Sequence, residues 1–148
     1  MRISAKGRYA LASTISLAED YGKGECTTVL SISEKLGISK IYLEQVFSLL
    51  KRGGIVNSVK GAQGGYQLAR MPREITLYDI LSAVELTLFE PSEATVPDSA
   101  PDIEKAMQTA VFEKIEAALK SSMQAVTLYD LVLEAEKYKS DDALMFYI

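Results

Sequence analysis

Two short helical patterns joined by one glycine constrain the fold of this chain more than any other feature. Thr28 stands where the first helix would begin, Gly37 closes it with the positive φ that glycine favours, and Ser39 is placed to cap the second. The connection is typical of a helix-turn-helix, in which the second helix enters the major groove of DNA. The apolar residues recur every three or four positions, as on one buried helix face: Val29, Ile32 and Leu36, then Leu43, Val46, Phe47 and Leu50.

A glycine-rich hairpin is expected directly after the second helix, which stops at Gly53. Two extended runs, Ile55–Lys60 and Tyr66–Ala69, flank residues 61–65, three of which are glycine. A two-stranded hairpin is marginally stable alone, so it must pack on the helices before it. The pattern therefore predicts a wing, and together with the helices a winged helix-turn-helix.

The rest of the chain reads as helical, which makes the expected fold class mainly α with a small β-hairpin. A first helix is expected over about Ser4–Asp20, and capping patterns at Thr76 and Thr127 open two later helices. A long helix is expected over about Asp102–Met123. The expected buried stripe of the first helix consists of Leu11, Ile15 and Ala18. The expected divisions are a winged helix-turn-helix over 1–85, a loop over 86–101, the long and closing helices over 102–138, and a tail over 139–148.

The charge is divided unevenly along the chain. Residues 1–73 carry eleven lysines and arginines against five acidic residues, a net charge of +6. Residues 74–148 carry five basic and fifteen acidic residues, a net charge of −10. A basic front half beside an acidic back half indicates a polyanion-binding surface, although chance segregation of solvated charge explains the same numbers.

The composition excludes several classes of site. The chain has no histidine and a single cysteine, which removes the commonest general base and leaves too few ligands for a zinc or iron–sulfur site. No apolar run is long enough to cross a membrane, and the charged start does not fit a signal peptide. We expect a cytoplasmic protein that is not an enzyme and binds no metal.

The outward side of the second helix of the motif predicts how DNA is read. Gln45 is suited to pairing with adenine, Glu44 to accepting a hydrogen bond from cytosine N4, and Lys40 and Tyr42 to reaching phosphate or base. The helix start at Ser39 favours a phosphate. For Glu44 an ordinary solvated carboxylate remains the alternative. The wing tip is expected against the backbone and minor groove, through Lys60, Gly61, Gln63 and Gly64.

Three segments make the sequence resemble the Rrf2 family of bacterial regulators. They are Lys6–Ala10, Gly37–Ser39 followed by Tyr42–Gln45, and Ser58–Ala69, and the likeness extends over almost the whole chain. The resemblance implies a homodimer, paired through the long helix, that binds a pseudo-palindromic duplex. DNA contacts carried over from the family are Ser4, Lys6, Arg8, Ser39, Tyr42, Glu44, Gln45, Lys60 and Gly61.

Many members of this family hold an iron–sulfur cluster through three cysteines in the loop before the dimerisation helix. Here residues 87–102 contain no cysteine, so we expect no cluster and no other cofactor. Cys26 lies in a different loop. It is either a small half-buried apolar residue or a redox-sensitive thiol, and the second role would need a lowered pKa.

The last residues of the chain are unexpectedly apolar. Met145, Phe146, Tyr147 and Ile148 follow a polar spacer, and leaving such side chains in water forgoes favourable burial. The tail either packs back on its own dimer or presents its terminal carboxylate and Ile148 to a partner. The ending resembles that of cluster-free family members that repress cysteine metabolism, which implies cysteine synthase as a corepressor that senses O-acetylserine. The alternatives are a regulator that answers to a small ligand or to oxidation of Cys26, and a winged-helix adaptor between proteins.

Overall fold

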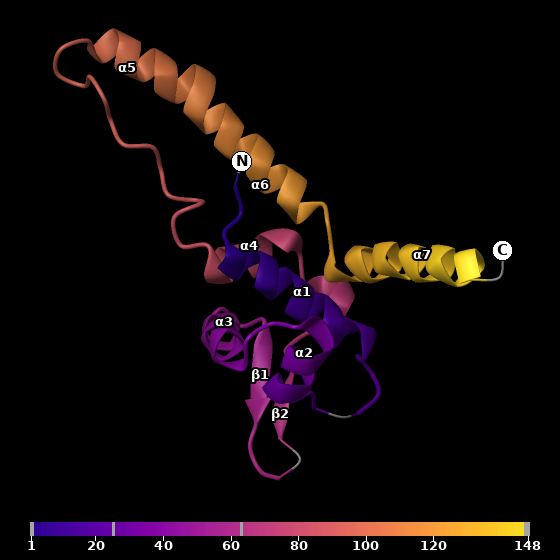
Figure 1. The fold of residues 1–148 in the computed structure, drawn as a ribbon. Helices are drawn as coiled ribbons and strands as arrows, with labels where there is room; N and C mark the ends of the chain where they lie inside the picture. Colours follow the sequence, from indigo (N-terminus) through magenta and orange to yellow (C-terminus); the bar gives the residue numbers. More distant parts are fainter. Residues whose placement is uncertain (1, 25, 63, 147–148) are drawn as a thin grey trace.

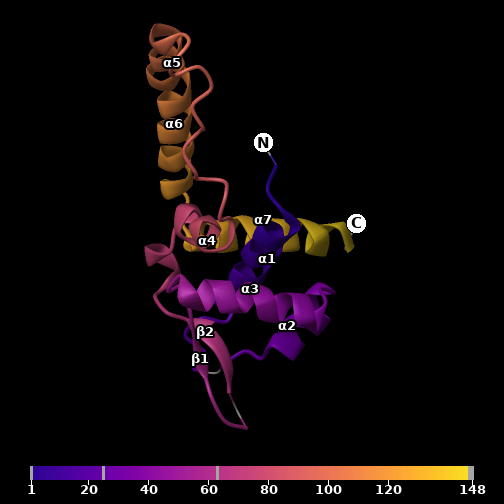
Figure 2. The same ribbon diagram turned by 90° about the vertical axis from the view of Figure 1, so that its left-hand side faces the viewer.

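The computed structural model describes the backbone of residues 2–24, 26–62 and 64–146, and the side chains of these residues up to Lys139. A helical body carries the hairpin at one end and a long helical arm at the other, as Figures 1 and 2 show. The elements in chain order are α1 (Ala5–Glu19), α2 (Val29–Leu36), α3 (Lys40–Arg52), β1 (Val56–Val59), β2 (Gly65–Leu68), η1 (Pro72–Glu74), α4 (Leu77–Val84), α5 (Pro101–Met107), η2 (Gln108–Phe112), α6 (Glu113–Gln124) and α7 (Leu128–Phe146).

The helix-turn-helix forms as the pattern predicts. Thr28 accepts a hydrogen bond from the backbone N–H of Ser31 and begins α2, and Gly37 ends it in the left-handed conformation with φ of 68°. The apolar face of α3 is fully buried and forms the centre of the core with α1, α2 and α4. Ser39 occupies the predicted N-cap position of α3, but among the described residues its side chain makes no capping hydrogen bond.

The buried side of α1 differs from the predicted stripe. Ala18 is buried as predicted, but Leu11 and Ile15 are only half buried, whereas Ala10, Thr14 and Leu17 are buried. Small residues allow α1 to lie close to α3, α4 and α7, which surround it. The Thr14 hydroxyl donates to the Ala10 carbonyl at 2.8 Å, so its burial leaves no polar group unsatisfied. The helix is therefore buried through small and internally bonded residues, a pattern that hydrophobic spacing does not detect.

The hairpin pairs β1 with β2 in antiparallel register, with Val56 opposite Leu68 and Val59 opposite Gly65. A short bridge extends it on the other side, because Thr27 and Tyr66 exchange backbone hydrogen bonds of 2.9 and 2.8 Å. The hairpin is also fastened to α3, since the rings of Phe47 and Tyr66 lie 4.7 Å apart. The expected packing of the wing on the helices is confirmed.

Both predicted capping patterns are present. Thr76 and Asp79 form a reciprocal capping box at the start of α4, and Thr127 and Asp130 exchange the same two hydrogen bonds at the start of α7. The N–H groups that follow these caps, those of Leu77 and Leu128, each bond across to the other segment at 2.8 Å. The two helix starts are thereby tied to one another.

The long predicted helix is present as one continuous arm, α5–η2–α6, but its middle section, Gln108–Phe112, is π-helical. The arm packs on the body through α6 against α4, and the loop 86–100 runs beside it to the far end (Figure 1). Buried Glu104 holds that loop, since its carboxylate accepts hydrogen bonds from the backbone N–H groups of Thr95 and Val96 at 2.9–3.2 Å.

Helix α7 crosses α1 and continues through Phe146, so most of the segment predicted as a tail is helical. Lys139 donates to the Glu19 carboxylate at 2.5 Å and ties this extension to the end of α1. This hydrogen bond raises the pKa of Lys139 above its ordinary value of 10.5. The side chains of Met145 and Phe146, and the whole of Tyr147 and Ile148, lie outside what the structure describes. Among the described residues no helix has the length and apolar character needed to span a membrane.

Candidate nucleic-acid interface

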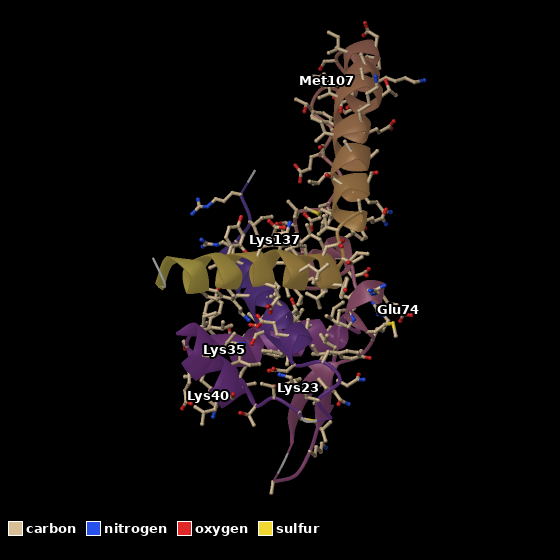
Figure 3. All side chains as sticks on the ribbon, turned by 90° about the vertical axis from the view of Figure 1, so that its right-hand side faces the viewer. Lys23, Lys35, Lys40, Glu74, Met107 and Lys137 are labelled. Atoms are coloured by element: carbon tan, nitrogen blue, oxygen red, sulfur yellow. The ribbon has the colours of Figure 1, made fainter. Side chains whose placement is uncertain are left out.

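Helix α3 presents a polar face on the side opposite the core. Lys40, Glu44 and Gln45 are exposed, whereas Leu43 and Phe47 on the opposite side of the helix are fully buried. Figure 3 shows Lys40 at the hairpin end of the body and Met107 far away on the arm. The far end of the arm and the outward face of α3 therefore lie at opposite ends of the protein.

The first turns of α1 lie beside the start of α3. The rings of Tyr9 and Tyr42 meet edge to face with their centroids 5.0 Å apart, and Tyr42 keeps 37% of its surface exposed. Arg8, the neighbour of Tyr9, is exposed and Lys6 is half buried. The Tyr9–Tyr42 contact thus joins the basic start of α1 and the recognition helix in one surface.

Ser4 has a structural role at the same place. It caps α1 by accepting from the Gly7 N–H at 3.2 Å, and both its N–H and its hydroxyl donate to the Glu85 carboxylate. Glu85 lies against Gly7, where a Cβ would collide with it. The carboxylate supplies the negative charge that a helix N-terminus favours and that the first turn of α1 lacks. The Ser4 hydroxyl therefore has a structural role, and the predicted contact of Ser4 with DNA would have to share this hydroxyl with Glu85 and Gly7.

The carboxylate of Glu44 lies 3.9 Å from the Lys40 ammonium, one turn earlier on α3. Both side chains are more than half exposed, so the pair contributes little stability. The lysine nevertheless offsets the repulsion that an acid would meet near phosphates. Glu44 is thus a solvated carboxylate with a cation beside it, which is compatible with accepting a hydrogen bond from a base edge.

The wing tip is built from backbone. Lys60 and Gly61 are exposed, and Gly61 has φ of 110°, a conformation that side chains disfavour. Gly64 donates to the Gly61 carbonyl at 3.0 Å, and a Cβ on Gly64 would collide with the carbonyls of Val59 and Gly61. Gln63, which was also predicted to contact DNA, lies outside the described residues. The exposed glycine and lysine leave the tip narrow and basic, as close approach to a phosphate backbone requires.

Sequence reasoning missed part of the outward face of α3. Ile41, Ser48 and Arg52 are all exposed and follow the same helical stripe as Gln45, at intervals of three or four residues. Extending the helical period outward from Gln45 would have identified them.

The donor set of this chain does not fit the iron–sulfur cluster that the Rrf2 resemblance brings into question. Cys26, the single cysteine, lies between α1 and α2, with its thiol 3.9 Å from the Gln67 side-chain oxygen on the wing. The loop 86–100 contains neither cysteine nor histidine, and Glu104 holds it instead through hydrogen bonds. No cluster of three potential metal ligands is found in the described part of the chain. Three thiolates cannot be supplied at the loop, so no cluster chemistry is assigned here.

A helix-turn-helix with an exposed polar recognition helix, a basic wing and a projecting arm defines a DNA-binding transcriptional regulator, not an enzyme. Residues 3–134 match the model of a family described as "Rrf2: Iron-dependent Transcriptional regulator", and the chain belongs to this Rrf2 family. The predicted winged helix-turn-helix class is confirmed by the solved structures of its relatives.

Three relatives show how far the similarity extends. The regulator CymR of Bacillus subtilis is 35% identical over 148 residues, all of both chains. Its structure, described as that of the global cysteine regulator, superposes with a TM-score of 0.72 over 90% of this chain and 98% of that one. T. potens IscR gives 33% identity and a TM-score of 0.70, over 93% and 90% of the two chains. The oxidized form of Staphylococcus aureus CymR gives 35% and 0.68, over 89% and 96%.

Proposed function

We propose that this chain represses genes of sulfur and cysteine metabolism by binding a pseudo-palindromic operator as a homodimer. The observation that carries the proposal is the full-length similarity to CymR, a global cysteine regulator, in both sequence and fold. The lack of cluster ligands points in the same direction, because it favours a signal other than iron.

The arm supports the homodimer. Ile103, Val111 and Ile115 on the arm (α5–η2–α6) are 54%, 43% and 61% exposed. A helix in a protein gains most of its stability by packing such an apolar face against another surface, and in the described part of the single chain this face packs against nothing that would bury it. A second copy of the same arm offers a matching apolar face across a two-fold axis. The two recognition helices would then enter successive major grooves, with half-sites about 34 Å or a multiple of it apart.

DNA readout is tested by substitution and by salt. A dimer that neutralises about six phosphates should show a slope near −5 in log K against log salt. Glu44→Ala and Gln45→Ala should relax base discrimination, whereas Lys60→Ala should weaken binding to all duplexes alike. Equal losses on specific and random DNA for all three variants would contradict the assignment of base readers, and binding without salt dependence would favour a protein-interaction adaptor.

Cysteine synthase is the proposed corepressor. In this proposal the tail presents the terminal carboxylate and Ile148 to the enzyme, and O-acetylserine displaces it. Support comes from the resemblance of the ending to cluster-free relatives and from the Lys139–Glu19 contact, which holds the extension of α7 to the body. Calorimetric titration of the enzyme into the full chain should give binding that O-acetylserine abolishes. Equal binding by a chain lacking Ile148 would rule the tail out.

A second candidate signal is a small ligand near the arm. A cavity of about 360 Å³ lies between α4, the start of the loop and α6, and its lining includes Tyr78, Phe89 and Lys120. A third is oxidation of Cys26, in keeping with the existence of an oxidized form of the S. aureus relative. If cysteine synthase has no effect on operator binding, operator affinity is measured with added metabolites and with peroxide, for the wild type and for Cys26→Ser. A small ligand should change the affinity of both proteins, whereas peroxide should change that of the wild type alone.

A further inference from the structure

Ile41 is an apolar side chain at an unusual place. It is the second residue of α3 and is 71% exposed, more than any other large apolar side chain among the described residues. Its neighbours on the helix surface, Lys40 and Glu44, form an exposed ion pair. Scattered exposed apolar residues are ordinary, so the exposure by itself assigns nothing, and the argument depends on the direction of the side chain.

The helical period places Ile41 at the centre of the outward face. With about 100° per residue, the four buried residues of α3 cover one side of the helix, and Ile41 points almost directly away from them. The exposed residues Gln45, Ser48 and Arg52 continue the same line along the helix. Ile41 therefore precedes Gln45 by one turn on the surface that would face the floor of the major groove.

The major groove offers one apolar group to such a side chain. Base edges there carry hydrogen-bond donors and acceptors, and the exception is the C5-methyl group of thymine. Ile41 packs against no other part of the described chain that would bury it, so its apolar surface leaves water only when α3 binds DNA. We propose that Ile41 contacts a thymine methyl group in each half-site and so selects thymine there, an inference that rests on the proposed DNA binding.

The geometry also places this thymine relative to the base read by Gln45. Four helical residues rise about 6 Å, and stacked base pairs are about 3.4 Å apart. The thymine selected by Ile41 is therefore within about two base pairs of the position at which Gln45→Ala relaxes specificity. This relation makes the inference independent of any particular operator sequence.

Thymine-to-uracil substitution tests the contact, because uracil lacks only the methyl group. The full-length protein is used to select its preferred duplex from a random pool, and each thymine is then replaced singly and in symmetric pairs. One buried methyl group contributes about 0.8 kcal/mol, so wild-type affinity should fall about fourfold per half-site and about fifteenfold for a symmetric pair. Ile41→Ala should lose this discrimination and bind the two duplexes equally.

Matched variants separate a methyl contact from a general loss. Ile41→Val retains a branched apolar side chain and should keep the preference for thymine. Because Ile41 is exposed, circular dichroism and thermal unfolding of the variants should match the wild type. The inference is overturned if no thymine lies in the expected window, or if Ile41→Ala discriminates as well as the wild type. A wild-type protein that selects no duplex would instead refute the proposed function.

Discussion

The arm provides the sharpest test of the dimer, through Ile115→Ala. The substitution removes three carbon groups from a side chain that is 61% exposed in the single chain. At about 0.8 kcal/mol per buried group, burying the exposed part of these three groups in the interface stabilises the dimer by about 1.5 kcal/mol in each copy. A two-fold interface repeats the loss, so the dimer should be weakened by about 3 kcal/mol, which is more than a hundredfold in its dissociation constant.

Sedimentation equilibrium over a concentration series measures this constant directly. Lys114→Ala, at the neighbouring exposed position, provides the control and should leave dimerisation unchanged. Ile115→Ala should also lose operator affinity when its concentration is below its raised dimer dissociation constant, and regain that affinity above it. An unchanged dimer in Ile115→Ala would show that the exposed face of the arm is not the interface and would refute the reasoning.

Three further predictions concern the body and the loop. Glu104→Ala removes a buried carboxylate that accepts from Thr95 and Val96, so urea unfolding should show a loss of about 2 kcal/mol, with faster hydrogen exchange at those two amides. Gly65→Ala places a Cβ 2.5 Å from the Thr27 carbonyl, and separating the bridge should cost about 1–3 kcal/mol, whereas an equally stable variant would contradict it. Hydrogen bonds from Thr127 lower the pKa of Asp130 below its ordinary 3.8, so its stabilisation is complete above pH 3.8 and lost as the pH falls through the folded value. The stability difference between the wild type and Asp130→Asn should therefore shrink on acidification, and a constant difference would disprove the linkage.

Features that depend on a few adjacent residues were predictable from the sequence. The caps at Thr28 and Thr76, the turn at Gly37 and the glycine-rich hairpin each need only chemistry within about four positions. The division of charge, and the lack of cysteine in the loop, likewise follow from counting residues. These features were enough to predict the fold class and the recognition helix.

Other features depended on groups that meet only in the folded chain. The sequence could not indicate that Glu85 would lie at the N-terminus of α1, or that Lys139 would bond to Glu19. It also misplaced part of the buried side of α1, since the small and hydroxyl residues there become a core only when three other helices close around them. Local periodicity records which residues share a face, whereas burial depends on what packs against that face. For that reason the sequence was sufficient for the motif that reads DNA, and the tertiary structure decided which side chains, Ile41 among them, remain exposed on its surface.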